Sequence, residues 1–187
     1  INGDSESGRA YKGEVIPKVS FEDINFEDYE VTLTRTRFGE KDVDVTAQFV
    51  TGNMSVNETG GQGTFDKFEE IAENDGIYTL TVTMTDKAGH ESSVVNTFTV
   101  NRFGSVYEYD TYLSTLVAEG GAYVNSITED LVITEYNADR LVEDSLYIEI
   151  TRDGKPLDEV SYEISSKINE EIQVGDSGWF QYTYTIG

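Results

Sequence analysis

The chain has 187 residues, and its 36 acidic and 13 basic side chains give a formal net charge of −23. Because such a surface repels phosphate groups, the sequence argues against nucleic-acid binding and against direct contact with anionic membranes. The absence of cysteine excludes disulfides, thiolate metal sites and a cysteine nucleophile. The chain begins at Ile1 without a secretion signal, so we expect it to be a segment of a longer protein.

Short segments in which apolar and polar residues alternate dominate the chain, and threonine, valine and tyrosine fill them. This period of two residues predicts β-strands. The predicted strands cover residues 14–21, 29–37, 44–50, 76–86, 94–100, 105–109, 130–136, 145–154, 159–165 and 178–186. Strands at short spacing, with almost no helical periodicity between them, predict an all-β sandwich or barrel.

Between the predicted strands lie segments rich in glycine and small polar residues, which are typical of turns. These segments are GGQG (60–63), NDG (74–76) and KAGH (87–90), and the segment RDGK (152–155) predicts a hairpin. Two other segments, 65–72 and 110–117, have the spacing for about one helical turn each.

An internal repeat relates the two halves of the chain. A gapless alignment pairs residues 10–27 with residues 122–139, and it places Asn25 opposite Asn137 with acidic residues around both. A Thr-Arg pair follows in each copy, after five additional residues in the second. Repetition of this kind indicates a duplicated structural unit.

The repeat predicts two related domains, residues 1–101 and 102–187, joined near Gly104. The first copy continues into its two longest predicted strands, whereas the second copy ends where their counterparts would begin. We therefore expect the second domain to be incomplete at its C-terminus.

The segment NDGIYTLTVTMTDKAGHESSVVNTFTV (74–100) resembles the closing hairpin of bacterial immunoglobulin-like (Ig-like) domains. Gly76 and Tyr78 match the entry to the first strand, and Asp86 and Gly89 match the turn. His90 departs from the asparagine that is usual in that family. These domains occur in tandem in cell-surface proteins of Gram-positive bacteria, so the resemblance implies two tandem Ig-like β-sandwich domains of an extracellular protein, secreted or attached to the cell wall.

The residues of this segment have structural roles that do not depend on the resemblance. The Tyr78 hydroxyl is placed to bond a backbone group at the preceding corner, as in a tyrosine corner. Gly89 is expected to take a positive φ in the turn. Leu80, Val82 and Met84 alternate with threonines, so the apolar set should face the core.

Two acidic runs raise the hypothesis of calcium binding, because calcium takes oxygen ligands that are closely spaced in a loop. The candidates are Asp23, Asn25, Glu27 and Asp28 in the first copy, and Glu135, Asn137 and Asp139 in the second. The competing interpretation is a turn shared by both copies, in which the asparagines adopt left-handed or Asx-turn geometry. We otherwise expect no cofactor; if calcium binds, it should bind at both copies.

A cluster of aromatic residues suggests a second kind of site, because aromatic faces stack on sugars. The candidates for glycan binding are Tyr107, Tyr109, Tyr112 and Trp179, and the alternative is that these rings pack into the core. No catalytic residues are predicted. The only histidine, His90, lies in a predicted turn and has no recognisable nucleophile to activate.

These features together predict a non-catalytic structural or adhesive module of a large bacterial surface protein. Such a module would act as a spacer or stalk, with adhesion to a host or matrix component as a further role. Its partners would be neighbouring Ig-like modules of the same polypeptide, and a host protein or glycan. The alternative is an accessory carbohydrate-binding module of an extracellular carbohydrate-active enzyme; a stalk stiffened by calcium is a third interpretation.

Overall fold

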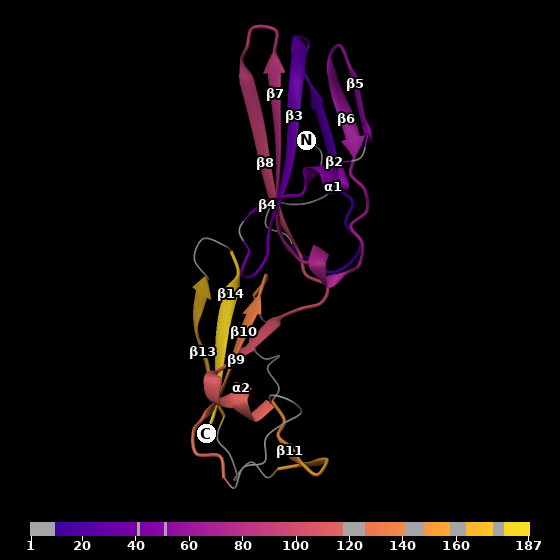
Figure 1. The fold of residues 1–187 in the computed structure, drawn as a ribbon. Helices are drawn as coiled ribbons and strands as arrows, with labels where there is room; N and C mark the ends of the chain where they lie inside the picture. Colours follow the sequence, from indigo (N-terminus) through magenta and orange to yellow (C-terminus); the bar gives the residue numbers. More distant parts are fainter. Residues whose placement is uncertain are drawn as a thin grey trace. The chain divides into compact units, whose positions relative to one another are not determined.

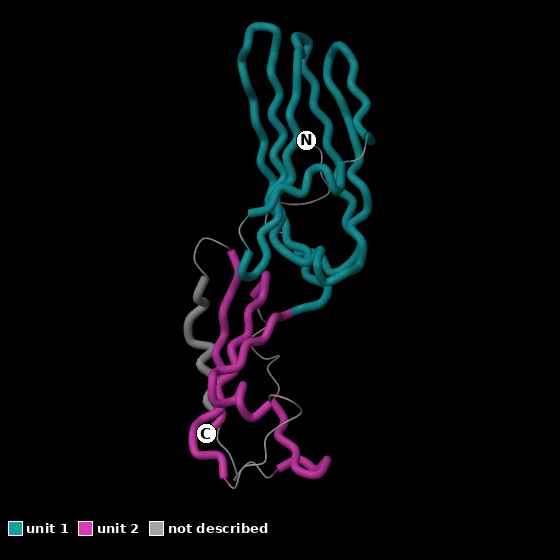
Figure 2. Tube along the Cα trace, viewed as in Figure 1, with its two compact units in different colours: residues 1–104 teal, residues 105–187 magenta. Residues whose placement is uncertain are grey.

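The computed structural model describes residues 10–40, 42–50, 52–117, 126–140, 148–157, 164–173 and 178–187. The chain is mainly β-sheet, as predicted. It divides into two compact units, residues 1–104 (unit 1) and residues 105–187 (unit 2), which Figure 2 shows in separate colours.

Unit 1 consists of two antiparallel sheets with one short parallel pairing. In chain order its elements are β1 (Ala10–Tyr11), β2 (Lys18–Glu22), β3 (Phe26–Thr36), β4 (Val43–Asp44), α1 (Thr46–Phe49), β5 (Met54–Asn57), β6 (Gly60–Thr64), the 3₁₀ turn η1 (Ala72–Asn74), β7 (Gly76–Asp86) and β8 (Glu91–Val100). One sheet has the strand order β1-β8-β7-β3-β4 and the other has the order β2-β6-β5. Figure 1 shows the long β7–β8 hairpin lying beside β3.

The core of unit 1 draws on both sheets. Strand β7 alternates as predicted from Tyr78 to Val82, since Tyr78, Leu80 and Val82 are buried while the threonines between them are partly exposed. Met84, which was also expected to face the core, is only partly buried. The partners of these residues in the core are Val15, Val19, Leu33, Val45, Phe49, Phe65, Phe68, Phe98 and Val100. An arrangement of two sheets around one apolar layer resembles a β-sandwich.

Residues 44–50 form one helical turn and not the predicted strand. In α1 the Val50 N–H donates to the Thr46 carbonyl over 2.8 Å, and the Asp44 carboxylate accepts the Thr46 N–H over 2.8 Å. Val45 and Phe49 are both buried, and they lie four residues apart in the sequence. That spacing places two side chains on one face of a strand or of a helix, so the pattern alone does not separate the two.

The GGQG segment was predicted to be a turn, and this prediction was wrong. Residues Gly60–Thr64 form β6, the central strand of the three-stranded sheet, paired with β2 on one side and with β5 on the other. Neighbouring side chains take the space that the glycines leave, and the Cζ of Phe21 would lie 2.6 Å from a Cβ at position 61. The helical turn expected at 65–72 is also displaced, because the 3₁₀ turn begins only at Ala72.

Unit 2 is built on one antiparallel sheet with the order β13-β14-β10-β9. In chain order its elements are β9 (Val106–Tyr109), α2 (Thr111–Val117), β10 (Leu131–Asn137), β11 (Thr151–Arg152), β12 (Lys155–Pro156), β13 (Ile164–Gln173) and β14 (Phe180–Ile186). The helix predicted near 110–117 is therefore present. So is the RDGK hairpin, where Asp153 and Gly154 have φ of 55° and 72°, as a tight hairpin turn requires.

The structure does not support the internal repeat. Strand β2 is an edge strand with one partner, whereas the aligned strand β10 lies between β9 and β14. The aligned Thr-Arg pairs also differ, because the first lies within the eleven-residue strand β3 and the second forms the two-residue strand β11. Residues 122–125 of the second copy lie outside the described residues.

Candidate functional site

Asp23 and Asn25 of the first acidic run lie in a tight turn between β2 and β3, whereas Glu27 and Asp28 lie on β3. The Asp23 carboxylate accepts the N–H of Asn25 over 2.6 Å, and the Asp28 carboxylate accepts the N–H of Tyr29 over 2.8 Å. Glu27 is exposed on the following strand. Asp23 and Asp28 thus bond the backbone of their own segment, which is the usual role of such residues in turns.

The second acidic run has different surroundings. Glu135 and Asn137 are buried in β10, at 5% and 6% exposure, and the Asn137 side-chain oxygen accepts the N–H of Asp139 over 3.0 Å. Asn25 is exposed in a turn, so the two asparagines do not share one geometry, and neither has a positive φ. Within the described ranges, no three His, Cys, Asp or Glu side chains gather closely enough to hold a metal ion. Calcium binding stays a hypothesis.

Glu135 is the centre of a buried hydrogen-bond network in unit 2. Its carboxylate accepts hydroxyl protons from Ser105 and Tyr184, and from Tyr107 over 3.3 Å. The Asn137 side chain donates to the Ser105 hydroxyl over 2.7 Å. Burial raises the pKa of the Tyr184 hydroxyl, and the bond to Glu135 raises it further. The network joins β9, β10 and β14 through one carboxylate, a structural tie that the sequence analysis did not predict.

The four aromatic candidates do not form a single platform. Trp179 is buried at 4% exposure, and the hydroxyl of the half-buried Tyr112 accepts the N–H of Thr128 over 3.0 Å. Tyr107 and Tyr109, two residues apart on β9, have exposed fractions of 55% and 50% and lie on one face of the sheet. Of the four candidates, Tyr107 and Tyr109 are the two whose side chains are exposed.

The entry to the closing hairpin of unit 1 is fixed by Tyr78. Its hydroxyl donates to the Asn74 carbonyl over 2.8 Å, its ring stacks on Phe98 at 5.4 Å between centroids, and burial raises its pKa to about 12. At Gly76 the backbone passes so close to β3 that a Cβ would lie 2.9 Å from the Thr36 carbonyl oxygen. These contacts make the corner a rigid part of the fold.

The turn of the same hairpin is organised by Asp86. One carboxylate oxygen accepts the N–H groups of Ala88 and His90, each over 2.8 Å, and the other lies 3.0 Å from the His90 Nδ1. This last bond lowers the pKa of Asp86 and raises the pKa of His90. Gly89 has a φ of 82°, in the region that favours glycine.

The segment that leaves unit 1 is held by two residues that the sequence analysis missed. The Asp75 carboxylate, 8% exposed, accepts the N–H groups of Arg102 and Phe103 over 2.8 and 2.7 Å. The Arg102 guanidinium donates to the Gly13 carbonyl over 3.1 and 3.0 Å, and to the Glu69 carbonyl over 2.9 Å. Arg102 thereby ties the residues after β8 to the residues just after β1.

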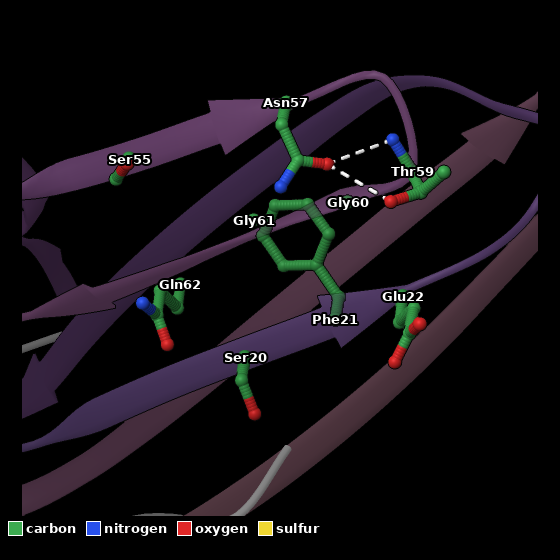
Figure 3. Close-up of a pocket in the computed structure, with 9 residues that line it drawn as sticks. All are labelled: Ser20, Phe21, Glu22, Ser55, Asn57, Thr59, Gly60, Gly61 and Gln62. Atoms are coloured by element: carbon green, nitrogen blue, oxygen red, sulfur yellow. Dashed lines mark hydrogen bonds between the residues drawn. The ribbon is translucent and has the colours of Figure 1, made fainter.

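The three-stranded sheet of unit 1 carries two hollows. Val19, Phe21 and Met54 pack on the core side of this sheet, so the alternate residues face outward. The first hollow has a volume of about 480 Å³ and the second about 450 Å³. Ser20, Ser55 and Gln62 line both of them. Figure 3 shows these three side chains on neighbouring strands, with Asn57 and Thr59 joined by hydrogen bonds at one end.

No protein-family model matches this chain, and no curated protein matches its sequence. No helix in the described ranges is long and apolar enough to cross a membrane.

The described residues thus offer three arrangements with different chemical uses. The Glu135 network and the Tyr78 corner consist of satisfied hydrogen bonds, which stabilise a fold. The Asp75–Arg102 contacts hold the segment that leaves unit 1 in place. The outer face of the three-stranded sheet instead presents hydrogen-bonding groups that have no partner within the described residues and are free to bind a ligand.

Proposed function

We propose that this chain is a non-catalytic, load-bearing part of an extracellular bacterial surface protein, built from two Ig-like β-sandwich domains. The observation that carries the proposal is the pairing of the first and last strands among the described residues of unit 1. Strands β1 and β8 run parallel, with Ala10 opposite Thr99 and Tyr11 opposite Val100. The N–H of Asn101 adds a bond to the Tyr11 carbonyl over 3.0 Å.

This pairing determines how unit 1 responds to tension. Because β1 and β8 point in the same direction, pulling the two ends of the unit apart slides one strand along the other. The hydrogen bonds between them are then loaded together and must break together. A domain whose terminal strands are paired in this way resists extension, which suits a spacer or stalk.

Arg102 extends the same resistance beyond the strands. Its guanidinium bonds the carbonyl of Gly13, which follows β1, and the carbonyl of Glu69 in the loop before β7. Hydrogen bonds to a charged group contribute about 1.5–3 kcal/mol each in favourable settings. Tension that reaches the end of β8 therefore has to break these contacts as well as the strand pair.

The extracellular setting rests on the sequence. A strongly acidic chain without cysteine, and a closing hairpin that resembles those of tandem Ig-like domains, support a secreted or wall-attached protein of a Gram-positive bacterium. In that setting the partners would be further modules of the same polypeptide, and a host protein or glycan at the surface reached by the stalk.

Single-molecule stretching of the chain through its two ends tests this function. We expect a discrete unfolding event for unit 1 that releases about 300 Å of chain, the extended length of the residues between Tyr11 and Phe103. Replacing Arg102 by methionine, which keeps much of the apolar stem, should lower the force of that event.

Arg37 provides a matched control, because its guanidinium makes a surface ion pair with Glu40 at 3.4 Å, three residues away. The change Arg37→Met should leave the force unchanged, since exposed pairs of this kind contribute little. Gradual extension of unit 1 without a discrete event, or equal forces for the Arg102 and Arg37 variants, would contradict the load-bearing function.

A further inference from the structure

The outer face of the three-stranded sheet in unit 1 is uncharged along its centre. Cross-strand pairing puts Ser20, Gln62 and Ser55 in one row across β2, β6 and β5. The next row places Glu22 and Asn57 on either side of Gly60. The protein has 36 acidic side chains, so a row of three neutral hydrogen-bonding side chains differs in charge from much of its surface.

The side chains of the central row have spare hydrogen-bonding capacity. Ser20, Ser55 and Gln62 make no side-chain hydrogen bond within the described part of the chain, and Ser55 and Gln62 are exposed. Together they offer two hydroxyls and an amide, each of which can both donate and accept. They stand on paired strands, so their spacing is fixed by the sheet and not by a loop.

The hollow beside this row includes Gly60, a position that cannot carry a side chain. Gly60 has a φ of 145°, and a Cβ there would meet the backbone of Phe21 and Glu22. Gly60 itself is buried and lines the first hollow together with Glu22 and Asn57, which Figure 3 shows on the neighbouring strands. In Asn57 the side-chain oxygen accepts bonds from the N–H and hydroxyl of Thr59, over 2.8 and 3.0 Å, which fixes the orientation of its amide.

We propose that this face is a binding site for a linear, neutral oligosaccharide. Sugar hydroxyls both donate and accept hydrogen bonds, as do the serines and amides of the face. The two hollows share Ser20, Ser55 and Gln62 and continue from Asn57 at one end to Thr64 at the other, so the site fits several linked sugar units better than one. Volumes of about 480 and 450 Å³ are in the usual range for small-ligand sites.

The charges around the site select against acidic sugars. The net charge of −23 repels anions at long range, and Glu22 lines one end of the site. Lys18 lines the other end, outside the central row. The site also offers few apolar recesses for the side chains of a peptide, since the large apolar residue in its lining, Phe21, has its ring stacked on Tyr29 at 4.9 Å.

The test is binding of the whole chain to an array of neutral glycans. Hits are then measured by calorimetry with purified hexasaccharides, for example those of β-1,4-linked glucose, xylose or mannose, beside hexagalacturonate as the acidic probe. We expect at least one neutral hexasaccharide to bind, hexagalacturonate not to bind, and the side-chain amide NMR signals of Gln62 to shift on binding.

Three variants locate the site. Gln62→Ala should weaken binding about fivefold or more, the effect of losing one to two hydrogen bonds, and Ser55→Phe should abolish binding by filling the shared part of the hollows. Gln48→Ala is the matched control, because Gln48 is exposed on α1 and lines neither hollow. Thermal melts of all three variants establish that unit 1 is folded.

Several outcomes would overturn the proposal: no neutral glycan binds, hexagalacturonate binds more tightly, or binding is lost equally in the Gln48 variant. Binding that is retained in folded Ser55→Phe would place the glycan elsewhere, for example on the exposed Tyr107 and Tyr109 of unit 2, and would equally refute this site. The proposal does not depend on the load-bearing function, which is measured by force and not by binding.

Discussion

Replacing Tyr78 by phenylalanine removes one oxygen atom from the core of unit 1. The hydroxyl is buried and donates to the Asn74 carbonyl over 2.8 Å, while the ring stacks on Phe98 and contacts Phe68 at 4.8 Å between centroids. Phenylalanine keeps both ring contacts, so the change removes only the polar interactions of the hydroxyl, which are the bond to Asn74 and a contact with Arg35. A buried acceptor left without its donor costs about 1–3 kcal/mol. For a domain of about 100 residues, this corresponds to a melting temperature lower by roughly 5–20 °C.

The assay is differential scanning calorimetry of the whole chain, combined with fluorescence of Trp179. That residue is the only tryptophan and lies in unit 2, so its emission reports on that unit. We expect the calorimetric transition of unit 1 to move to lower temperature. The fluorescence transition should not move, because the contacts of Tyr78 that are described above lie within unit 1.

Tyr29 supplies the control. Its ring stacks on Phe21 at 4.9 Å, and its side chain is only partly buried. Tyr29→Phe should therefore cost less than about 0.5 kcal/mol, as surface changes usually do. Equal stabilities of the Tyr78 and Tyr29 variants would refute the reasoning, because the buried hydrogen bond would then contribute nothing beyond the ring.

Two further predictions concern titratable groups. The bond to Asp86 raises the pKa of His90, so an NMR titration should place it above 6.5, and Asp86→Asn should return it toward that value. Because the folded pKa of His90 is the higher one and that of Asp86 is the lower one, this pair stabilises the fold in the acidic range where Asp86 is ionised and His90 is protonated. The stabilisation is lost as the pH rises through the pKa of His90 and as it falls through the pKa of Asp86. In unit 2, Glu135→Gln replaces an acceptor of three hydroxyl bonds by a group that also donates, and should destabilise the unit by about 1–3 kcal/mol. The melting temperature of unit 2, followed by Trp179 fluorescence, measures this loss of stability. An unchanged melting temperature would contradict a stabilising role of the Glu135 network.

The parts of the fold that could be predicted are those that depend on the types and spacing of neighbouring residues in the sequence. Strand β7 alternates tyrosine, leucine, valine and methionine with threonine from Tyr78 to Thr85, and this pattern predicts a strand with one face buried. The RDGK turn is similar, because Asp153 and Gly154 are residues that accept positive φ and they separate two extended segments.

The parts that could not be predicted depend on residues distant in sequence. The glycine-rich segment 60–63 predicts a turn, yet it forms most of strand β6. The space that side chains would occupy at Gly61 and Gly63 is filled by Phe21 and Met54 from the neighbouring strands. The sequence suggests Glu135 only as a candidate calcium ligand, and the pairing of β10 with β9 and β14 is what brings the hydroxyls of Tyr107 and Tyr184 to it. The periodicity of one segment does not show which strands pair with each other. The sequence analysis therefore missed the Glu135 network and the face of the three-stranded sheet, which both depend on strand pairing.

The two proposals for unit 1 use different sheets, and this separation has a measurable consequence. The terminal strands β1 and β8 belong to the five-stranded sheet, whereas the proposed glycan face belongs to the sheet of β2, β6 and β5. Tension enters through Tyr11 and leaves through Arg102, so it loads the first sheet directly. If this division is right, Gln62→Ala should weaken glycan binding without changing the unfolding force, and Arg102→Met should lower the force without changing binding. A stalk built in this way could hold a glycan under load, because the side chains that bind it would not be on the strands that slide.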